Sequence, residues 1–254
     1  MSLDERSITL MPLDEETLIE YGVSRLQSFC HTMGIKADAQ QLRVCVEHLL
    51  YVIQVNEYMN LTRITDFDEA LILHILDSLT LLPYMPVETS RALDMGTGAG
   101  FPGIPLAAVS DSSWMLLDSV GKKIKAVQAF SSILGLRNVD AYHDRIESFA
   151  AHHKQEFDLV VARALAPLSV LLEYARPFLH VGGFLLVSKG CPDEDELSSS
   201  AEAAKILGYV LDRHDEFELP VDAGHRTVML YRVTRPSQVK LPRANGLARK
   251  KPLA

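Results

Sequence analysis

Leu93-Asp94-Met95-Gly96-Thr97-Gly98-Ala99-Gly100-Phe101-Pro102-Gly103-Ile104-Pro105 is the stretch that decides the fold. A short apolar run ends at Met95, three glycines follow at alternate positions, and a segment of small residues comes directly after them. Glycine carries no Cβ, so Gly96, Gly98 and Gly100 let the backbone adopt positive φ and let a ligand lie directly on the main chain. The pattern predicts a strand, a tight loop and a helix N-terminus whose free N–H groups face a polar or anionic ligand.

Two nucleotide ligands fit this loop. Gly98-x-Gly100-x-x-Gly103 satisfies the dinucleotide fingerprint, whereas Asp94-x-Gly96-x-Gly98-x-Gly100 is the arrangement of S-adenosylmethionine (SAM) methyltransferases. SAM carries an ammonium and a sulfonium group, so the Asp94 carboxylate beside the loop suits it. A β–α turn without any ligand is the third alternative, and we consider it the weakest because three unused glycines would each cost on the order of 0.5–1 kcal/mol.

Composition places the chain among globular proteins. Its 254 residues, 48% of them hydrophobic, are enough to bury a large core. No apolar run approaches the roughly 20 residues of a membrane span, and the acidic N-terminus, with Asp4 and Glu5, does not resemble a signal peptide. The three cysteines lack the paired spacing of a metal site. We therefore expect a cytoplasmic protein without a bound metal.

Alternating strands and helices are predicted after Pro86. Strands are expected at 92–95, 114–118, 139–143, 157–162, 184–188, 209–217 and 227–233, and helices at 104–109, 122–134, 146–152, 168–179 and 194–207. This alternation predicts an α/β fold with a doubly wound, mostly parallel seven-stranded sheet of the Rossmann-like type. No helix separates the last two strands, so we expect them to form an antiparallel pair at one edge.

Helical periodicity precedes the sheet. Two amphipathic helices are predicted over 13–54, separated at Gly34, and a third over about 69–82. We therefore divide the chain into three parts: an N-terminal helical extension (1–88), an α/β domain (89–235) and a basic C-terminal tail (236–254).

The net charge of −8 is unevenly distributed along the chain. Residues 1–222 carry a net charge of −16, whereas residues 223–254 hold eight lysines or arginines and no acidic residue. A basic tail on an acidic body suits a polyanionic partner such as nucleic acid. The alternative is a solvated end that only aids solubility. In neither case do we expect the tail to contact the cofactor.

Polar side chains follow several predicted strands at the edge where doubly wound sheets bind ligands. Asp118, about 20 residues after the glycines, suits ribose hydroxyls, and a helix N-cap is its alternative role. Ile146-Glu147 follows the third strand and is placed to meet an adenine edge. Arg163 and Lys189 end the fourth and fifth strands on the same side as Asp94.

The helix predicted over 69–82 carries a polar face. His74, Asp77 and Ser78 lie within one turn, so His74 and Ser78 share a face. Either this face closes over the glycine loop or His74 is an ordinary core histidine, and the sequence leaves both alternatives open.

Together these residues resemble the bacterial 16S ribosomal RNA guanine-N7 methyltransferases, also called the glucose-inhibited division protein B family. The resemblance covers nearly the whole chain and rests on these matches: Asn60-Leu61-Thr62, His74-x-x-Asp77-Ser78-Leu79, Asp94-x-Gly96-Thr97-Gly98-Ala99-Gly100-Phe101-Pro102-Gly103, Leu117-Asp118-Ser119-x-Gly121-Lys122-Lys123, Arg163-Ala164-x-Ala166, Lys189-Gly190 and Lys250-Lys251-Pro252-Leu253. The sequence departs from the family at Leu73, where a basic residue is usual, and over 243–249, where a Gly-Thr-Pro version is more common.

The resemblance implies transfer of the SAM methyl group to N7 of a guanine in the 530 loop of 16S ribosomal RNA, in the small ribosomal subunit. N7 has a lone pair and no proton to lose, so we expect alignment of the reactants, and not a general base, to drive the reaction. Two alternatives remain: a SAM-binding RNA-binding or scaffold protein without turnover, and an NAD-dependent oxidoreductase.

The site residues follow from the motifs and the resemblance together. The expected cofactor-binding residues are Asp94, Gly96, Gly98, Gly100, Phe101, Asp118, Ile146, Glu147 and Arg163. Of these, Arg163 and Asp94 are also the candidates for catalysis, Arg163 by binding the methionine carboxylate, the base or a phosphate. The candidate RNA contacts are His74, Lys122, Lys123, Arg145, Lys189, Arg243, Lys250 and Lys251. We expect the protein to be a monomer.

Overall fold

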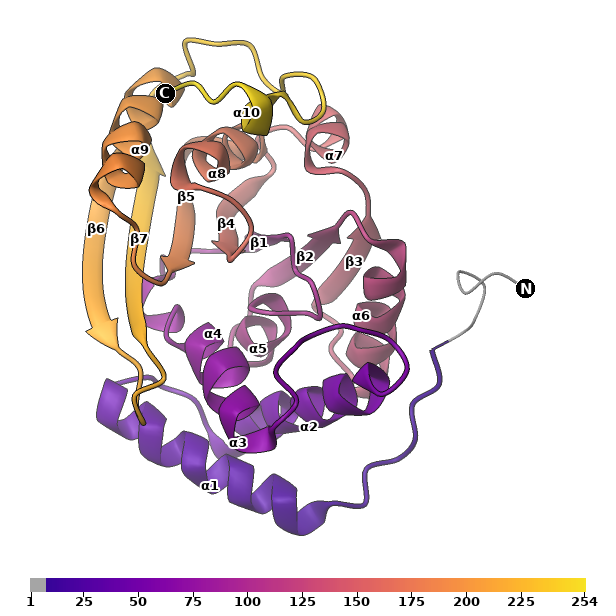
Figure 1. Ribbon diagram of the computed structural model, residues 1–254. Coiled ribbons are helices and arrows are strands. Elements are labelled where there is room, and N and C mark those ends of the chain that lie inside the picture. Colours follow the sequence, from indigo (N-terminus) through magenta and orange to yellow (C-terminus); the bar gives the residue numbers. More distant parts are fainter. Residues whose placement is uncertain (1–7) are drawn as a thin grey trace.

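A seven-stranded sheet forms the centre of the structure, a computed structural model that describes residues 8–254. Residues 1–7, and with them Asp4 and Glu5 of the acidic N-terminus, lie outside the described residues. The strand order is β3-β2-β1-β4-β5-β7-β6 (Figure 1). The strands are β1 (Arg91–Met95), β2 (Ser113–Asp118), β3 (Val139–His143), β4 (Phe157–Arg163), β5 (Leu179–Lys189), β6 (Tyr209–Glu218) and β7 (His225–Val233).

Strands β1 to β5 are parallel to one another, whereas β7 pairs antiparallel with both β5 and β6. The predicted mostly parallel sheet with an antiparallel pair at one edge is therefore confirmed. β1 lies at the centre of the sheet between β2 and β4, and the strand order reverses direction between β1 and β4. Ligands bind beside such a switch point, at the carboxyl ends of the strands.

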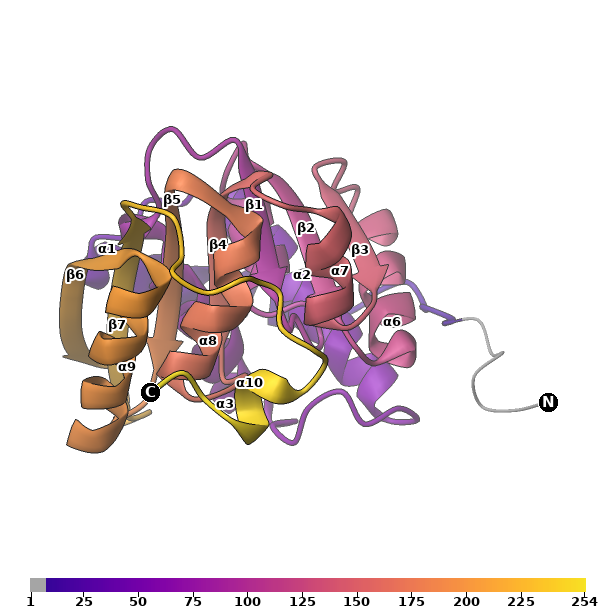
Figure 2. The same cartoon turned by 90° about the horizontal axis from the view of Figure 1, so that it is seen from above.

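Helices cover both faces of the sheet, as its apolar strands require. Along β4, Leu159 and Val161 face one core, and Val160 and Ala162 face the other, because successive side chains of a strand alternate. Figure 2 shows α8, α9 and α10 together on one side of the sheet. The helices after β1 are α5 (Gly103–Ala108), α6 (Gly121–Ile133), α7 (Ile146–His152), α8 (Leu168–Ala175), the 3-10 turn η4 (Arg176–Phe178), α9 (Glu194–Leu207) and α10 (Leu247–Lys250).

The N-terminal helices share the core on the face of α5 and α6. Their bounds are α1 (Glu16–Met33), α2 (Ala39–Asn56), α3 (Phe67–Ala70), the π-helix η2 (Leu71–Leu76), α4 (Asp77–Leu79) and the 3-10 turn η3 (Leu82–Tyr84). Gly34 ends α1 in the left-handed conformation, as its predicted role as a break requires. No helix within residues 8–254 is both long and apolar enough to cross a bilayer.

The prediction of one continuous α-helix over 69–82 is wrong in the middle of this range. Asp66 begins the helix by accepting a hydrogen bond from the Glu69 N–H group, but a π-helix then follows over Leu71–Leu76. The Arg163 guanidinium explains the irregularity, because its Nη1 donates to the main-chain oxygens of Leu73 at 3.1 Å and His74 at 3.4 Å. π-turns often mark functional positions.

The basic tail is folded onto the domain. Ala248 in α10 is 2% exposed, and Arg243 forms an ion pair with Glu173 of α8. The alternative of a solvated end is therefore wrong for this segment. The sequence did not reveal this packing because its apolar residues are few and its anchors come from distant parts of the chain.

Candidate active site

The glycine loop joins β1 to α5 at the carboxyl edge of the sheet. Gly96, Gly98 and Gly100 have φ angles of 86°, 61° and 97°, which confirms the predicted positive φ. A Cβ at Gly96 would also lie 2.7 Å from Cδ1 of Leu165, a distance that real contacts do not reach. The loop therefore needs glycine both for its conformation and for the close approach of the segment after β4.

Asp94 anchors the glycine loop through a hydrogen bond. The carboxylate is fully buried, and its Oδ2 accepts a hydrogen bond of 2.9 Å from the Gly103 N–H group. Its Oδ1 has no hydrogen-bond partner among the described residues. Burial raises the pKa of Asp94 to about 7. Asp94 lines neither of the cavities described below, so its contact with a cofactor and its part in catalysis stay predictions.

A cavity of about 300 Å³ lies beside the loop. Asp118, at the end of β2, lines it and accepts hydrogen bonds of 2.9 Å from the N–H groups of Gly98 and Val120. Val120, not Asp118, occupies the N-cap position of α6, so the helix-cap alternative does not describe this residue. The remaining predicted residues at this cavity are Gly96, Arg145, Ile146 and Glu147.

Part of the tail closes the same cavity. Gly246 and Arg249 line it together with Tyr174, and the Gly246 N–H group donates to Glu147 Oε1 at 2.7 Å. The tail thus lines this cavity, although the sequence predicts no contact between the tail and the cofactor. Nothing in the sequence pairs Gly246 with Glu147, because 99 residues separate them and only the fold brings them together.

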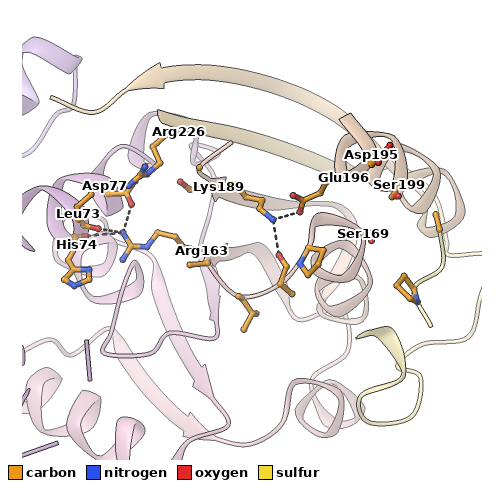
Figure 3. Close-up of a pocket in the computed structure, with 18 of the residues that line it drawn as sticks. Leu73, His74, Asp77, Arg163, Ser169, Lys189, Asp195, Glu196, Ser199 and Arg226 are labelled. Atoms are coloured by element: carbon orange, nitrogen blue, oxygen red, sulfur yellow. Dashed lines mark hydrogen bonds and ion pairs between the residues drawn. The ribbon is translucent and has the colours of Figure 1, made fainter. Parts of the chain in front are cut away.

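A larger cavity, of about 1060 Å³, shares the lining residue Leu165 with the first. Figure 3 shows side chains from the N-terminal helices, the ends of β4 and β5, β7 and α9 around it. Asp77 is the centre of its polar network: its Oδ2 lies 3.0 Å from Arg163 Nη1, and its Oδ1 lies 2.8 Å from Arg226 Nε. The Asp77 side chain is only 5% exposed. In the sequence, Asp77 belongs to a motif that gives it no role, and no pattern distinguishes Arg226 from the other basic residues near the C-terminus.

A stack of rings connects this network to the glycine loop. His74 lies parallel to Phe101, with 4.6 Å between the ring centroids and 10° between the planes. The face of His74 therefore closes over the loop, which decides between the two alternatives for that helix. Burial, followed by the nearby Arg163 charge, lowers the pKa of His74 to about 4. His74 is thus neutral at pH 7, and its contact with RNA stays a prediction.

A second histidine holds the loop from the core side. His48 in α2 is fully buried, its ring centroid lies 4.7 Å from that of Phe101, and its Nε2–H donates to the Ala99 oxygen at 2.9 Å. Burial lowers the pKa of His48 to about 3. His48 could not be identified from the sequence, because it lies among the apolar residues of α2 and belongs to no motif.

The candidate RNA contacts fall into two groups. Lys189 forms an ion pair with Glu196 at the larger cavity, and Arg243 binds Glu173, so both cations already have acidic partners. The exposed cations are Lys122, Arg145, Lys250 and Lys251, and Lys123 is half-buried. Within residues 8–254, no cluster of three or more His, Cys, Asp or Glu side chains is arranged to hold a metal ion.

The chain matches a family model described as rRNA small subunit methyltransferase G over residues 41–220. It is 34% identical over 232 residues to the ribosomal RNA small subunit methyltransferase G of Alkaliphilus metalliredigens, a match that covers 90% of this chain and 97% of that protein. A protein of the same name from Desulfitobacterium hafniense is 39% identical over 224 residues, which cover 87% of this chain and 93% of the relative.

Solved structures show the same fold. The ribosomal protein L11 methylase from Lactobacillus delbrueckii subsp. bulgaricus matches with a TM-score of 0.51 at 19% sequence identity, over 63% of this chain and 77% of that one. Of the two nucleotide interpretations of the glycine loop, the match to the family model and to these relatives confirms the methyltransferase interpretation. The chain belongs to the GidB family, the small-subunit ribosomal RNA methyltransferases G, and is a SAM-dependent enzyme that methylates ribosomal RNA.

Proposed function

We propose that this enzyme methylates N7 of a guanine in 16S ribosomal RNA, with the SAM nucleoside in the smaller cavity and the guanine in the larger one. One observation carries this assignment: Leu165, beside the glycine loop at the carboxyl edge of the sheet, lines both cavities. A methyl donor and an acceptor base bound in cavities that share a lining residue can meet in line, which is the main requirement of this reaction.

The residues around the smaller cavity fit SAM. The Asp118 carboxylate is placed to accept hydrogen bonds from ribose hydroxyls, and Ile146 offers an apolar surface for the adenine. Asp94 lines neither cavity, but its buried Oδ1 has no hydrogen-bond partner among the described residues, and an ammonium group bound near the glycine loop would compensate its charge. Bound SAM supplies an electrophilic methyl group. His48 holds the glycine loop through Ala99 and Phe101, so the loop would offer bound SAM a fixed main-chain surface.

The larger cavity suits an acceptor that needs no proton transfer. His74 is neutral at pH 7, and no deprotonated base is required because N7 carries a free lone pair. The methylated guanine is cationic. The cavity wall holds Arg163, Lys189 and Arg226 together with Asp77, Asp195 and Glu196, so cations and carboxylates balance and the product is not repelled.

The acceptor reaches this cavity from an unpaired region of RNA, since the edge that carries N7 is deeply buried in an A-form helix. We propose that the exposed cations Lys122, Arg145, Lys250 and Lys251 contact the phosphates around it.

We further propose that the enzyme acts as a monomer in the bacterial cytoplasm on the small ribosomal subunit. In this scheme residues 1–88 support the loop, residues 89–235 bind SAM, and residues 236–254 complete the surface.

The test is a methylation assay with labelled SAM and purified 30S subunits or 16S ribosomal RNA, followed by digestion and nucleoside analysis. We expect the label in 7-methylguanosine. A matched RNA fragment that carries 7-deazaguanosine at the modified position lacks the acceptor nitrogen and should receive no label. Label in another nucleoside, or unchanged labelling of the deaza substrate, would contradict the proposal.

A further inference from the structure

Residues 242–254 lie across the cavity that we assign to SAM. The Gly246 N–H group donates to Glu147 at 2.7 Å, and Arg249 Nη2 donates to the Leu165 oxygen at 2.9 Å. Both Gly246 and Arg249 line the smaller cavity, and Pro252 and Ala254 line the larger one. The segment therefore contributes walls to both cavities, beside the sheet, its crossover helices and the N-terminal helices that form the rest of the site.

Specific anchors hold this segment in place. Arg243 binds Glu173 through two hydrogen bonds, of which that from Nε is 2.7 Å, and the Glu173 side chain is 4% exposed. Arg243 also donates to the Lys251 oxygen at 2.8 Å, which ties the two ends of the segment together. Ala248 between them is 2% exposed. An ion pair with a buried carboxylate specifies one position, because a displaced Arg243 would leave Glu173 uncompensated.

The strength of these contacts is uneven. The sheet edge and α7 contribute buried side chains to the hydrophobic core, whereas within 242–254 only Ala248 is buried in this core and Leu253 packs against it. Hydrogen bonds from Gly246 and Arg249 hold the four-residue helix α10 at the cavity. Segments with few buried apolar groups open at a lower free-energy cost than core elements. The C-terminal segment is thus the part of the cavity wall that can open most readily.

We propose that residues 242–254 form a strap that closes the cofactor site, retains the nucleoside and must lift when cofactor and product exchange. This rests on the proposed position of SAM in the smaller cavity. Arg249 is the residue that pins the strap, since it spans from α10 to the main chain of the segment after β4.

The experiment compares Arg249→Ala with Lys240→Ala in the full-length protein, and uses S-adenosylhomocysteine as a probe that cannot react. Both variants remove one cation from the C-terminal segment, but Lys240 is exposed and lines neither cavity. Calorimetry should give a Kd about two- to tenfold higher for Arg249→Ala, because the strap loses an exposed hydrogen bond from a guanidinium to a main-chain oxygen. Stopped-flow measurements should place this change in faster dissociation. Lys240→Ala should match the unmodified protein.

The outcomes separate this inference from the function on which it rests. Equal affinities and dissociation rates in Arg249→Ala and Lys240→Ala, at unchanged melting temperature, would overturn the strap. Equal losses of affinity in Arg249→Ala and Lys240→Ala would also overturn the strap, since they would show that any cation lost from the C-terminal segment weakens binding. Asp118→Ala is the reference: if it weakens binding while Arg249→Ala does not, the strap alone fails. If Asp118→Ala binds normally as well, the position of the cofactor itself fails.

Discussion

Asp77 and Arg163 form a buried ion pair across 86 residues of sequence, with 3.0 Å between Oδ2 and Nη1. Their side chains are 5% and 12% exposed, and the second carboxylate oxygen binds Arg226. One carboxylate from the N-terminal helices thus orients two guanidinium groups from β4 and β7 at the larger cavity. We therefore predict that Asp77 is a positioning residue, which acts on the proposed acceptor site through Arg163.

Asp77→Asn should reduce both stability and turnover. Removing one partner of a buried pair costs about 3–5 kcal/mol, since the remaining charges lose their compensation. We expect turnover to fall while the Kd for SAM stays nearly constant, because Asp77 lines only the larger cavity. Asp215→Asn is the control, as the Arg213–Asp215 pair is exposed and worth about 0–1 kcal/mol. A variant with normal turnover would show that Asp77 serves the fold alone.

Arg163→Lys tests the guanidinium itself. Lysine keeps the charge opposite Asp77, so we expect a small change in melting temperature. It loses the planar group that binds Asp77 and the main-chain oxygens of Leu73 and His74 together. We expect turnover to fall at least about tenfold, or on the order of 1.4 kcal/mol. Unchanged single-turnover rates on ribosomal RNA would remove Arg163 from the active site.

Asp118 is expected to hold the ribose and also the loop. Asp118→Ala should weaken SAM binding by roughly 10- to 150-fold, which corresponds to a charged hydrogen bond of about 1.5–3 kcal/mol. Asp118→Asn keeps one oxygen that can accept from the Gly98 N–H group, so it should lose less. Calorimetry on both variants measures the difference. Equal losses of SAM affinity in Asp118→Ala and Asp118→Asn would show that the charge of the carboxylate matters, and not its hydrogen bond to the glycine loop.

Asp94 predicts a pH dependence of stability. Its pKa is about 7 in the folded protein because the carboxyl is buried, against about 3.9 in an unfolded chain. The stability that its protonated form contributes is complete below about pH 4 and is lost as the pH rises through 7. Asp94→Asn stays neutral and keeps an acceptor for Gly103. Between pH 5 and pH 8 the ligand-free variant should therefore gain on the order of 1–3 kcal/mol relative to the unmodified protein.

Urea unfolding of both proteins at the two pH values measures this gain. If the difference between them is the same at pH 5 and pH 8, the Asp94 carboxyl does not titrate in this range. Asp158 is the carboxylate to compare with the buried Asp94. It binds Ser90 and Arg91 at the opposite end of β1 and is partly exposed.

Local sequence patterns predict most of the fold but shorten one strand. The strands are apolar runs between turn signals, and all seven occur near their expected positions. β5, expected at 184–188, begins already at Leu179, because Gly182 and Gly183 resemble a turn. Here the strand continues through them: Gly182 adopts a φ of 98°, and the pairing with β4 shifts register between Phe157 and Leu159. The irregularity depends on the partner strand, which no local pattern shows.

The site was predictable where its residues follow the strands. Asp118 and Arg163 lie at strand ends, so topology alone brings them to one edge. The Asp77–Arg226 pair spans 149 residues and joins a helix to an antiparallel strand, so no spacing rule predicts it. The tail was assigned by its charge alone, and this hid its packing. Basic residues can anchor a segment as well as bind RNA, and only the buried Glu173 distinguishes these roles for Arg243.

The remaining cations of the tail should set the salt dependence of RNA binding. Lys250 and Lys251 are exposed and line neither cavity. If both contact phosphates, replacing both with alanine should lower the slope of log K against log salt by up to about 1.4, at roughly 0.7 per single-strand contact. The affinity for S-adenosylhomocysteine should not change.

Lys36→Ala is the control, since this exposed residue lies between α1 and α2, far from α10 (Figure 1). Titrations at several salt concentrations give the slopes. Equal slopes for the double variant and Lys36→Ala would leave these lysines without a role in RNA binding and assign the phosphate contacts to Lys122 and Arg145.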